Sequence, residues 1–342
     1  YEGLSKLSEI IDKKYSDKVK IHLENKIKNA RNINVGIEIK KASNNFLDVN
    51  FEIEGIKPQD VEIVTEAIKK EKKFITLSSG ELVKIANKSM EELLGIVDSI
   101  GNIKVGKNRI SKVKALQLAQ ISKNIREDLE KLDEFKELFH KIKNRKEVEP
   151  KNIKVSLFPY QKLGFNWLKN MYDIGFGGIL ADDMGLGKTL QTISLLNEVY
   201  QENKDFLGLI IVPSSLLYNW KEEIIKFTGI TPILVEGVAS SRKKIIESQK
   251  SGFLITTYQA LRNDIEEYKN RIFDIVVLDE AQNIKTTTSQ IKKAVMKINS
   301  RVNFALTGTP VENNILELWS IFDFVIPGYL DSLSKFKKTY KE

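Results

Sequence analysis

The 342-residue chain contains no cysteine, which excludes disulfide bridges and metal sites built on thiolates, such as zinc fingers and iron–sulfur clusters. Its two histidines, His22 and His140, lie far apart in the sequence, so a histidine-rich metal site is excluded as well. The longest apolar stretches, such as residues 206–212, are far shorter than the roughly 20 residues that a membrane-spanning helix needs. We therefore expect neither a structural metal site nor a membrane partner.

The composition is that of a folded chain with a mild basic excess. Hydrophobic residues make up 42% of it, which is enough to bury a sizeable core, and the length predicts two domains. The 54 lysines and arginines exceed the 46 acidic residues, and the net charge of +8 makes nucleic acid a candidate partner. The chain opens at Tyr1 rather than at methionine, and we expect it to be part of a longer protein.

The sequence changes character near Pro150, and we place a domain boundary between residues 150 and 151. In the first domain, the spacing predicts a strand at 34–39, followed by a strand, a short helix and two strands between 46 and 85. Ser89 is expected to cap another short helix. Apolar residues three and four apart between 111 and 144 predict one long amphipathic helix, or two helices nearly in line. The first domain therefore has the pattern of a small α+β domain.

The second domain, residues 151–342, alternates short apolar runs with helical stretches. Helical stretches follow the first, second and fourth runs, an alternation that is typical of βαβ units around a buried, mainly parallel sheet. The fold class is therefore α/β, and we expect the chemistry directly after these runs, because such sheets bind ligands at the carboxyl ends of their strands. The runs lie at 177–181, 208–212, 253–257, 273–278 and 302–307.

A phosphate-binding loop is expected between the first run and its helix. Gly185 and Gly187 let backbone N–H groups turn towards phosphate oxygens, Lys188 can reach the terminal phosphates, and the Thr189 hydroxyl can hold Mg²⁺. The strict pattern has glycine where this chain has Asp182, and the alternative interpretation is a glycine-rich helix start with an incidental lysine. The expected nucleotide-binding residues of the loop are Gly185, Leu186, Gly187, Lys188, Thr189 and Leu190.

The fourth run leads into two adjacent carboxylates, Asp279 and Glu280. A phosphate-binding loop needs an acid at the end of an apolar strand to hold Mg²⁺, and a second acid beside it can activate the attacking water. We therefore expect Asp279 to bind the metal and Glu280 to act as the general base. Taken alone, the pair also fits an ordinary strand-end turn that carries two acids.

Three segments, together with the phosphate loop, resemble the Swi/Snf family of helicase-like DNA translocases. They are Asp279-Glu280-Ala281-Gln282, Thr307-Gly308-Thr309-Pro310-Val311-Glu312-Asn313-Asn314 and Phe158-Pro159-Tyr160-Gln161-Lys162-Leu163-Gly164-Phe165-Asn166-Trp167-Leu168. The resemblance covers about residues 157–330 and rests on several motifs that follow one another in order along that range. It implies a RecA-like ATP-binding lobe, the first of two, with a DEAQ box and with ATP and Mg²⁺ as cofactors.

The resemblance also implies roles for single residues. Gln161 is expected to read the adenine, and Gln282 to belong to the catalytic segment. Trp220, which follows the first DNA-contact segment, is more typical of a packing residue. The residues expected to couple the ATP site to DNA are Thr307, Gly308 and Thr309. The expected contacts to the DNA backbone are Pro213, Ser214, Ser215, Thr256 and Thr257.

The first domain resembles, less closely, the helicase-associated domain found ahead of the ATPase in many bacterial relatives, through residues 49–56 and 73–83. Together the two resemblances imply a motor that translocates on double-stranded DNA and remodels complexes of DNA-bound proteins, in the bacterial cytoplasm at the nucleoid. The second lobe is expected in cis, and nothing after Gly328 supplies it. We therefore expect this chain alone to hydrolyse almost no ATP.

Two other classes stay open: a different P-loop enzyme, such as a GTPase or signalling ATPase, and a non-catalytic interaction module with a vestigial nucleotide site. A GTPase would carry an Asn-Lys-x-Asp segment after the loop, whereas the segment Asn87-Lys88-Ser89-Met90 precedes the loop and lacks the aspartate. Intact Lys188, Asp279 and Glu280 argue against a vestigial site.

No acidic residue lies between Asp98 and Glu127, and the seven basic residues in this interval carry nearly all of the net charge. The candidate contacts to DNA phosphates among them are Lys107, Arg109 and Lys112. The alternative is a solvated basic helix start that the following acids balance. Reversing the three charges separates the two interpretations. ATP turnover stimulated by DNA should fall if these residues bind phosphate, and unchanged turnover removes that interpretation.

Overall fold

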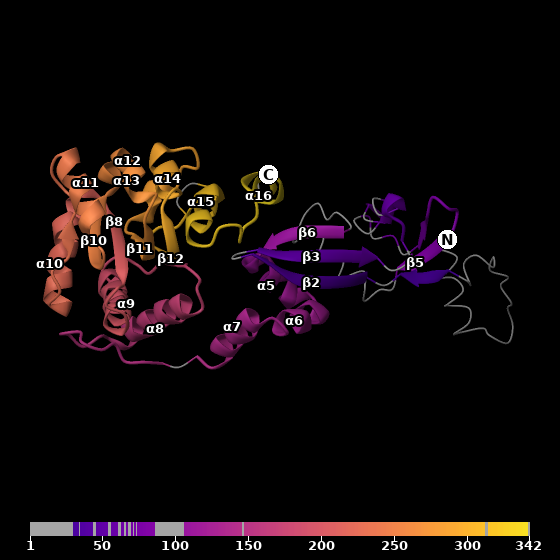
Figure 1. The fold of residues 1–342 in the computed structure, drawn as a ribbon, viewed down its shortest axis with the longest axis horizontal. Helices are drawn as coiled ribbons and strands as arrows, with labels where there is room; N and C mark the ends of the chain where they lie inside the picture. The colour runs from indigo at the N-terminus through magenta and orange to yellow at the C-terminus, as the bar shows by residue number, and fades with distance from the viewer. Residues whose placement is uncertain are drawn as a thin grey trace. The chain divides into compact units, whose positions relative to one another are not determined.

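The computed structural model of the chain describes residues 30–85 and 106–340, with gaps at 34, 44–45, 54–55, 61–62, 65, 68–69, 71, 73, 146 and 312–313. The backbone forms two compact units, residues 1–137 and 138–342 (Figure 1). They divide inside helix α7 (Asp133–Lys143), whereas the sequence places the domain boundary between residues 150 and 151. The boundary after Pro150 stays a prediction.

The described strands of the N-terminal unit form two three-stranded sheets. One is antiparallel, in the order β2-β3-β6, and in the other β5 pairs parallel with β1 and antiparallel with β4. The three strands expected between 46 and 85 are confirmed, and where the helix is expected the described residues show a 3₁₀ turn, η1 (Pro58–Asp60), and helical backbone at 63–64 and 66–67. The helix expected after Ser89 lies outside the described residues. The strands are β1 (Arg31–Ile33), β2 (Val35–Ser43), β3 (Phe46–Ile53), β4 (Phe74–Thr76), β5 (Leu82–Ile85) and β6 (Gly106–Ser111).

Three helices occupy the stretch where the spacing predicts one long helix or two nearly in line. They are α5 (Lys112–Ile121), α6 (Lys123–Glu130) and α7 (Asp133–Lys143). Ser122 ends α5 because its backbone is extended, at φ −120° and ψ 120°, and its side chain caps α6 by accepting a hydrogen bond from the Ile125 N–H. A serine that caps the next turn offers the backbone an alternative to a continuous helix, which the apolar spacing alone does not reveal.

The C-terminal unit, hereafter the lobe, contains a six-stranded sheet in the order β7-β12-β11-β8-β10-β9. All of its strand pairs are parallel, which confirms the predicted fold class. The five predicted runs are all strands, while β9 and the helices directly after β10 and β12 were not predicted. The strands are β7 (Gly178–Leu180), β8 (Leu207–Val212), β9 (Ile233–Leu234), β10 (Gly252–Thr257), β11 (Ile272–Leu278) and β12 (Asn299–Leu306).

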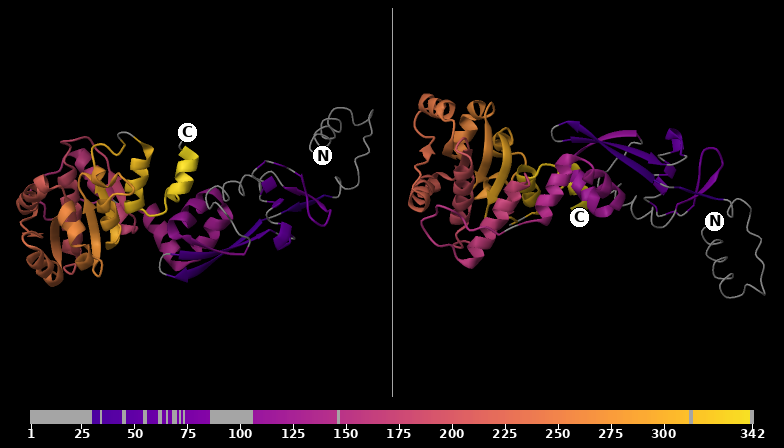
Figure 2. Two further views of the ribbon diagram at one scale, coloured as in Figure 1. Left: turned by 90° about the horizontal axis from the view of Figure 1, so that it is seen from above. Right: turned by 60° about the horizontal axis from the view of Figure 1, so that its bottom comes forward.

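Helices cover both faces of this sheet (Figures 1 and 2). One hydrophobic cluster joins the sheet to α8 (Pro159–Asp173), α9 (Lys188–Glu202) and α10 (Leu217–Thr228). The second cluster, on the opposite face, joins it to α11 (Ala239–Ser248), α12 (Tyr258–Asn263), α13 (Ile265–Tyr268), α14 (Gln290–Val295) and α15 (Ile315–Val325). A final helix, α16 (Leu333–Tyr340), follows. Alternate residues of β8 enter opposite clusters, so the strand is buried on both faces and has to be continuously apolar.

The parallel sheet brings the segments after its strands to one edge. The N–H of Asp279, just after β11, donates to the carbonyl of Ile211 in β8 (2.9 Å), and the N–H of Thr307, just after β12, donates to the carbonyl of Leu180 in β7 (3.2 Å). The predicted site residues of the lobe therefore lie mainly along one edge of its sheet, which is where such sheets bind ligands.

Among the described residues, no helix is both long and apolar enough to cross a membrane.

Replacing Ser122 by alanine tests the helix break of the N-terminal unit. The Ser122 hydroxyl is buried and accepts a hydrogen bond from the Ile125 N–H (3.3 Å), so Ser122→Ala should lower the free energy of unfolding by about 1 kcal/mol. Chemical denaturation measures the change, with Gln120→Ala at an exposed position of α5 as the control. If residues 112–130 formed one continuous helix, alanine would instead stabilise the protein through its higher helix propensity.

Candidate functional site

The phosphate loop, residues 182–189, follows β7 and includes the first two residues of α9. Gly185 and Gly187 have φ angles of +85° and +75°, which lie in the left-handed region that favours glycine. No side chain caps α9, so its first N–H groups stay open to a ligand such as phosphate. The Lys188 ammonium donates to the carbonyls of Asp182 (2.7 Å) and Asp183 (3.0 Å), so the backbone at the start of the loop binds the lysine at its end.

Two glutamine side chains hold the outer part of this loop. The Nε2 groups of Gln161 and Gln191 both donate to the Leu186 carbonyl, at 3.4 and 3.3 Å. Gln161 is buried, and its Oε1 accepts the N–H of Phe158 (3.0 Å), which ties the start of α8 to the loop. In this structure Gln161, the predicted adenine reader, thus buttresses the phosphate loop. Its role towards adenine stays a prediction.

Gln191 was missed by the sequence analysis. It is fully buried, and its Nε2 group also donates to the Asp182 carboxylate (3.3 Å). A Cβ on Gly164 would meet the Gln191 Oε1 at 1.8 Å, so α8 and α9 approach closely at this point. The signal that points to such a partner is Asp182 itself, because a carboxylate that replaces the usual glycine needs a donor when it is partly buried.

The carboxylate of Asp279 is held at both oxygens. Its Oδ2 accepts the indole N–H of Trp220 in α10 (2.7 Å), and its Oδ1 accepts the N–H of Glu280 (2.9 Å). Burial raises the pKa of the Asp279 carboxyl, while these two hydrogen bonds and the nearby Lys188 oppose the rise. Trp220 is buried in the hydrophobic cluster, as its predicted packing role requires, but it also binds the predicted metal residue.

Glu280, the predicted general base, has a left-handed backbone with φ 48° and ψ 58°. Its Oε2 accepts a hydrogen bond from Gln282 Nε2 (2.7 Å), and Gln282 Oε1 accepts one from the Thr307 hydroxyl (3.0 Å). The Thr309 N–H donates to the same hydroxyl (3.1 Å). A chain of hydrogen bonds therefore links the predicted base to the segment expected to couple the site to DNA. That coupling stays a prediction.

The side chains around the loop suit a magnesium ion held partly by a nucleotide. Among the described residues, no group of three or more histidine, cysteine or acidic side chains is placed to form a complete metal site. Thr189 and Asp279 offer oxygen ligands, and Mg²⁺ is commonly held by one or two protein oxygens together with phosphates and water. The donor set thus fits Mg²⁺ with a nucleoside triphosphate, with Thr189 and Asp279 as the residues that would hold it.

The predicted DNA-contact residues of the lobe differ in exposure. Ser214 and Ser215 are exposed in the 3₁₀ turn η2 (Ser214–Leu216) that follows β8 and the half-buried Pro213. The half-buried Thr257 caps α12 by accepting the N–H of Ala260 (3.2 Å). Thr256 is fully buried, as are the three residues before it in β10, so its side chain is not exposed in this structure, and its contact to DNA stays a prediction.

Three side chains of the basic interval, those of Lys112, Lys123 and Arg126, form ion pairs with acidic residues of α6 and α7. Lys107 and Arg109 lie on β6, and nothing is described of their side chains. Lys112, at the start of α5, pairs with Glu134 of α7 at 2.9 Å. This ion pair favours the solvated, balanced interpretation for Lys112, whose charge is already offset. A phosphate contact by Lys107 or Arg109 stays a prediction.

Replacing Gly187 by alanine tests whether the loop geometry binds a nucleotide. A Cβ at Gly187 would meet the Gln161 Nε2 at 2.4 Å and displace it, so we expect the affinity for ATP to fall about tenfold. The control is Gly175→Ala, because Gly175 has nearly the same φ, 76°, but nothing within 4 Å of an added Cβ. Both changes cost backbone strain, so equal ATP affinities in a nucleotide titration would contradict the role of the loop.

Comparison with known proteins agrees with this arrangement over both units. Residues 160–342 match the family model described as the SNF2-related domain, and residues 1–151 match the one described as bacterial SNF2 helicase associated. An uncharacterized ATP-dependent helicase of Mycoplasma genitalium is 38% identical over 252 residues, which is 73% of this chain and 23% of that protein. A chromatin-remodeling ATPase INO80 of Gibberella zeae is 36% identical over 208 residues, which is 57% of this chain and 11% of that protein.

A solved structure supports the same assignment. The Sulfolobus solfataricus SWI2/SNF2 ATPase core in complex with double-stranded DNA is similar with a TM-score of 0.52 and 42% identity. The similarity covers 56% of this chain and 40% of that one. The chain thus spans less than half of the length of these proteins. Its match over residues 160–342 nevertheless covers more than half of its own length, and the chain belongs to the SNF2-related family.

Proposed function

We propose that the lobe binds ATP with Mg²⁺ as part of a DNA-dependent ATPase that translocates on double-stranded DNA and remodels protein–DNA complexes. The observation that carries this proposal is geometric: Lys188 follows β7 and Asp279 follows β11, and only β12 separates these two strands in the parallel sheet, so both side chains lie at the same edge. A phosphate-binding cation beside a buried metal-binding carboxylate is the arrangement that phosphoryl transfer requires.

Each side chain of the edge has a defined task in this proposal. Lys188 exchanges its two backbone carbonyls for the terminal phosphates, and the open N–H groups of α9 bind the same phosphates. Thr189 and Asp279 would hold Mg²⁺, and the chemistry that the ion would supply is neutralisation of negative charge on the phosphates. Glu280 accepts the proton of the attacking water, and Gln282 keeps the Glu280 carboxylate in place through their hydrogen bond.

Double-stranded DNA is the proposed track. The exposed hydroxyls of Ser214 and Ser215, and Thr257 at the end of β10, suit backbone phosphates, which position a protein without reading sequence. The similar ATPase core was solved with double-stranded DNA, and a relative is named a chromatin-remodeling ATPase. Because this chain covers 40% of that core, we further propose that hydrolysis depends on a second lobe in cis that supplies the remaining transition-state contacts.

Replacing Glu280 by glutamine in the full-length protein tests the catalytic assignment. The amide keeps the size of the side chain but cannot accept the proton, so kcat with double-stranded DNA should fall by about 10²–10⁴-fold while ATP affinity stays within about twofold. Glu247→Gln, at an exposed position of α11, is the matched control and should keep the turnover of the wild type.

The same assay tests the need for a second lobe. Residues 1–342 alone should hydrolyse ATP close to the background rate, with and without DNA, since a transition-state arginine supplied from elsewhere contributes about 10³–10⁵ in related NTPases. Strong turnover by residues 1–342 alone would contradict this dependence. Absence of DNA-stimulated turnover in the full-length protein would contradict the proposed function as a whole.

A further inference from the structure

Two buried aromatic residues from different helices donate hydrogen bonds to Asp279. The indole N–H of Trp220, in α10, binds the Oδ2 of the carboxylate at 2.7 Å. The hydroxyl of Tyr258, the first residue of α12, binds the backbone carbonyl at 2.7 Å. Both side chains are almost fully buried, at 2% and 3% exposure, so water does not compete for either bond. Neither residue belongs to the chemistry proposed above.

Each aromatic residue closely follows a segment proposed to contact DNA. Trp220 is the fourth residue of α10 and lies five positions after the exposed Ser215. Tyr258 is the neighbour of Thr257 at the end of β10. β8 pairs with both β10 and β11, so the two segments leave the sheet on one side of Asp279. The structure therefore gives each proposed DNA-contact segment one direct bond to the residue proposed to bind the metal.

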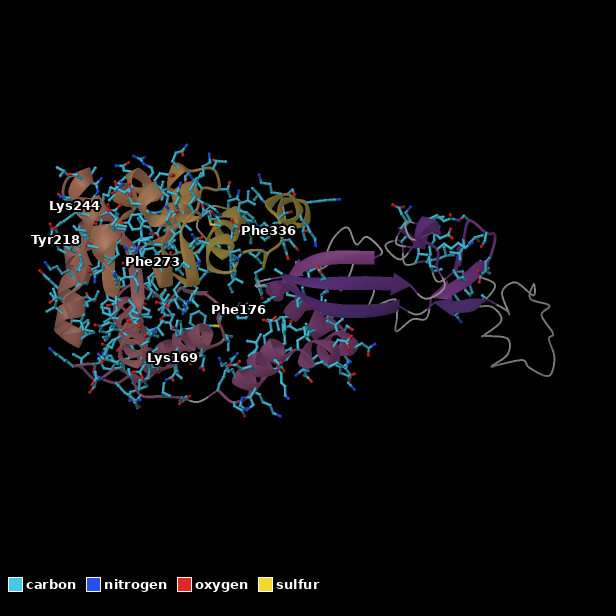
Figure 3. The ribbon with its side chains drawn as sticks, in the orientation of Figure 1. Lys169, Phe176, Tyr218, Lys244, Phe273 and Phe336 are labelled. Carbon is cyan, nitrogen blue, oxygen red and sulfur yellow. The ribbon has the colours of Figure 1, made fainter. Side chains whose placement is uncertain are left out.

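The two donors reach Asp279 from opposite faces of the sheet. Trp220 packs in the cluster beneath α8, α9 and α10, whereas Tyr258 packs in the cluster beneath α11 to α15. Leu217, Trp220 and Ile224 form the buried face of α10, and Tyr218 lies on its exposed side at the outer surface of the lobe (Figure 3). A helix packed in this way moves as a unit, so a shift at its start also shifts the Trp220 ring.

The two bonds fix different parts of the catalytic pair. The Trp220 bond orients the carboxylate of Asp279, whose other oxygen is taken by the Glu280 N–H. The Tyr258 bond holds the peptide group that joins Asp279 to Glu280, where the backbone turns into the left-handed region at φ 48°. A side-chain hydrogen bond is lost by about 3.6 Å, so lengthening either 2.7 Å bond by less than 1 Å is enough to release the group that it holds.

We propose that Trp220 and Tyr258 are positioning residues through which DNA bound after β8 and β10 sets Asp279 and Glu280 in the geometry for hydrolysis. This inference rests on the proposed DNA-dependent ATPase. It is separate from the chain of bonds through Gln282 and Thr307, which reaches Glu280 from the segment after β12. In this proposal DNA binding changes the geometry of Asp279, the proposed metal ligand, as well as that of Glu280, the proposed base.

The test compares hydrolysis with and without double-stranded DNA in the full-length protein, and its readout is the ratio of the two kcat values. Tyr258→Phe removes one hydroxyl and keeps the ring, and Trp220→Phe removes the indole N–H. Partners that orient metal ligands typically contribute about 10–100-fold, so each change should lower this ratio at least about tenfold, with DNA affinity within about twofold of the wild type. A role in packing alone would lower both rates together and leave the ratio unchanged.

The chain offers matched controls for both changes. Tyr268→Phe also removes a buried tyrosine hydroxyl from the second cluster, but this hydroxyl lies beside Thr256. Ile224→Val trims the same buried face of α10 without removing a donor. Both controls should keep the wild-type ratio. If Trp220→Phe does not fold, Tyr258→Phe, which conserves the packing, decides alone.

A double-mutant cycle tests whether the serines after β8 act on hydrolysis through Trp220. Ser214→Ala combined with Ser215→Ala should lower the DNA-stimulated ratio, and adding Trp220→Phe should then lower it little further, because both changes interrupt one link. Independent, multiplicative effects on the ratio would overturn the proposal, as would a wild-type ratio in Tyr258→Phe and Trp220→Phe. A wild-type protein without DNA stimulation would instead overturn the proposed function beneath it.

Discussion

The site depends on a carboxylate that the fold buries at the end of a β-strand. Burial raises the pKa of Asp279, so the folded lobe binds a proton there more tightly than the unfolded chain does, and ionising the group costs stability. The fold offsets part of that cost with the N–H groups of Trp220 and Glu280. A cation beside Asp279 would offset the rest, which is why a buried, ionised carboxylate suits a metal-dependent site better than an exposed one.

The sheet that buries Asp279 was predictable because its strands are covered on both faces. Such strands are continuous apolar runs, and all five runs found in the sequence are strands of the lobe. β9 has two residues, too few to form a pattern. The helix after β10 begins at Tyr258, and Thr257 is both the last strand residue and the helix cap, so no polar loop separates the two elements. In the N-terminal unit, Ser122 splits a helical pattern that is otherwise uninterrupted.

Within the site, residues defined by the local backbone were predictable and residues defined by distant contacts were not. Gly185, Gly187 and Lys188 follow from the loop pattern, and the two glycines do have the left-handed backbone that the pattern requires. The bond from Trp220 to Asp279 joins positions 59 residues apart, and no local pattern distinguishes such a donor from a packing residue. Thr256 shows the converse limit, because β10 is buried on both of its faces, and this burial covers a hydroxyl that a motif alone assigns to DNA.

Protein groups already bind the Lys188 ammonium and the Leu186 carbonyl of the phosphate loop, whereas no side chain caps the first N–H groups of α9, and this difference determines where a nucleotide gains by binding. The Lys188 ammonium already donates to two backbone carbonyls, and Gln161 and Gln191 already hold the Leu186 carbonyl. A phosphate that displaces the lysine contacts exchanges hydrogen bonds rather than adding them, so only the difference contributes to affinity. Asp182, which stands where the strict loop pattern has glycine, is also bound within the protein, because its carboxylate accepts a hydrogen bond from Gln191. The gain on binding a phosphate therefore comes mainly from the uncapped N–H groups of α9 rather than from Lys188.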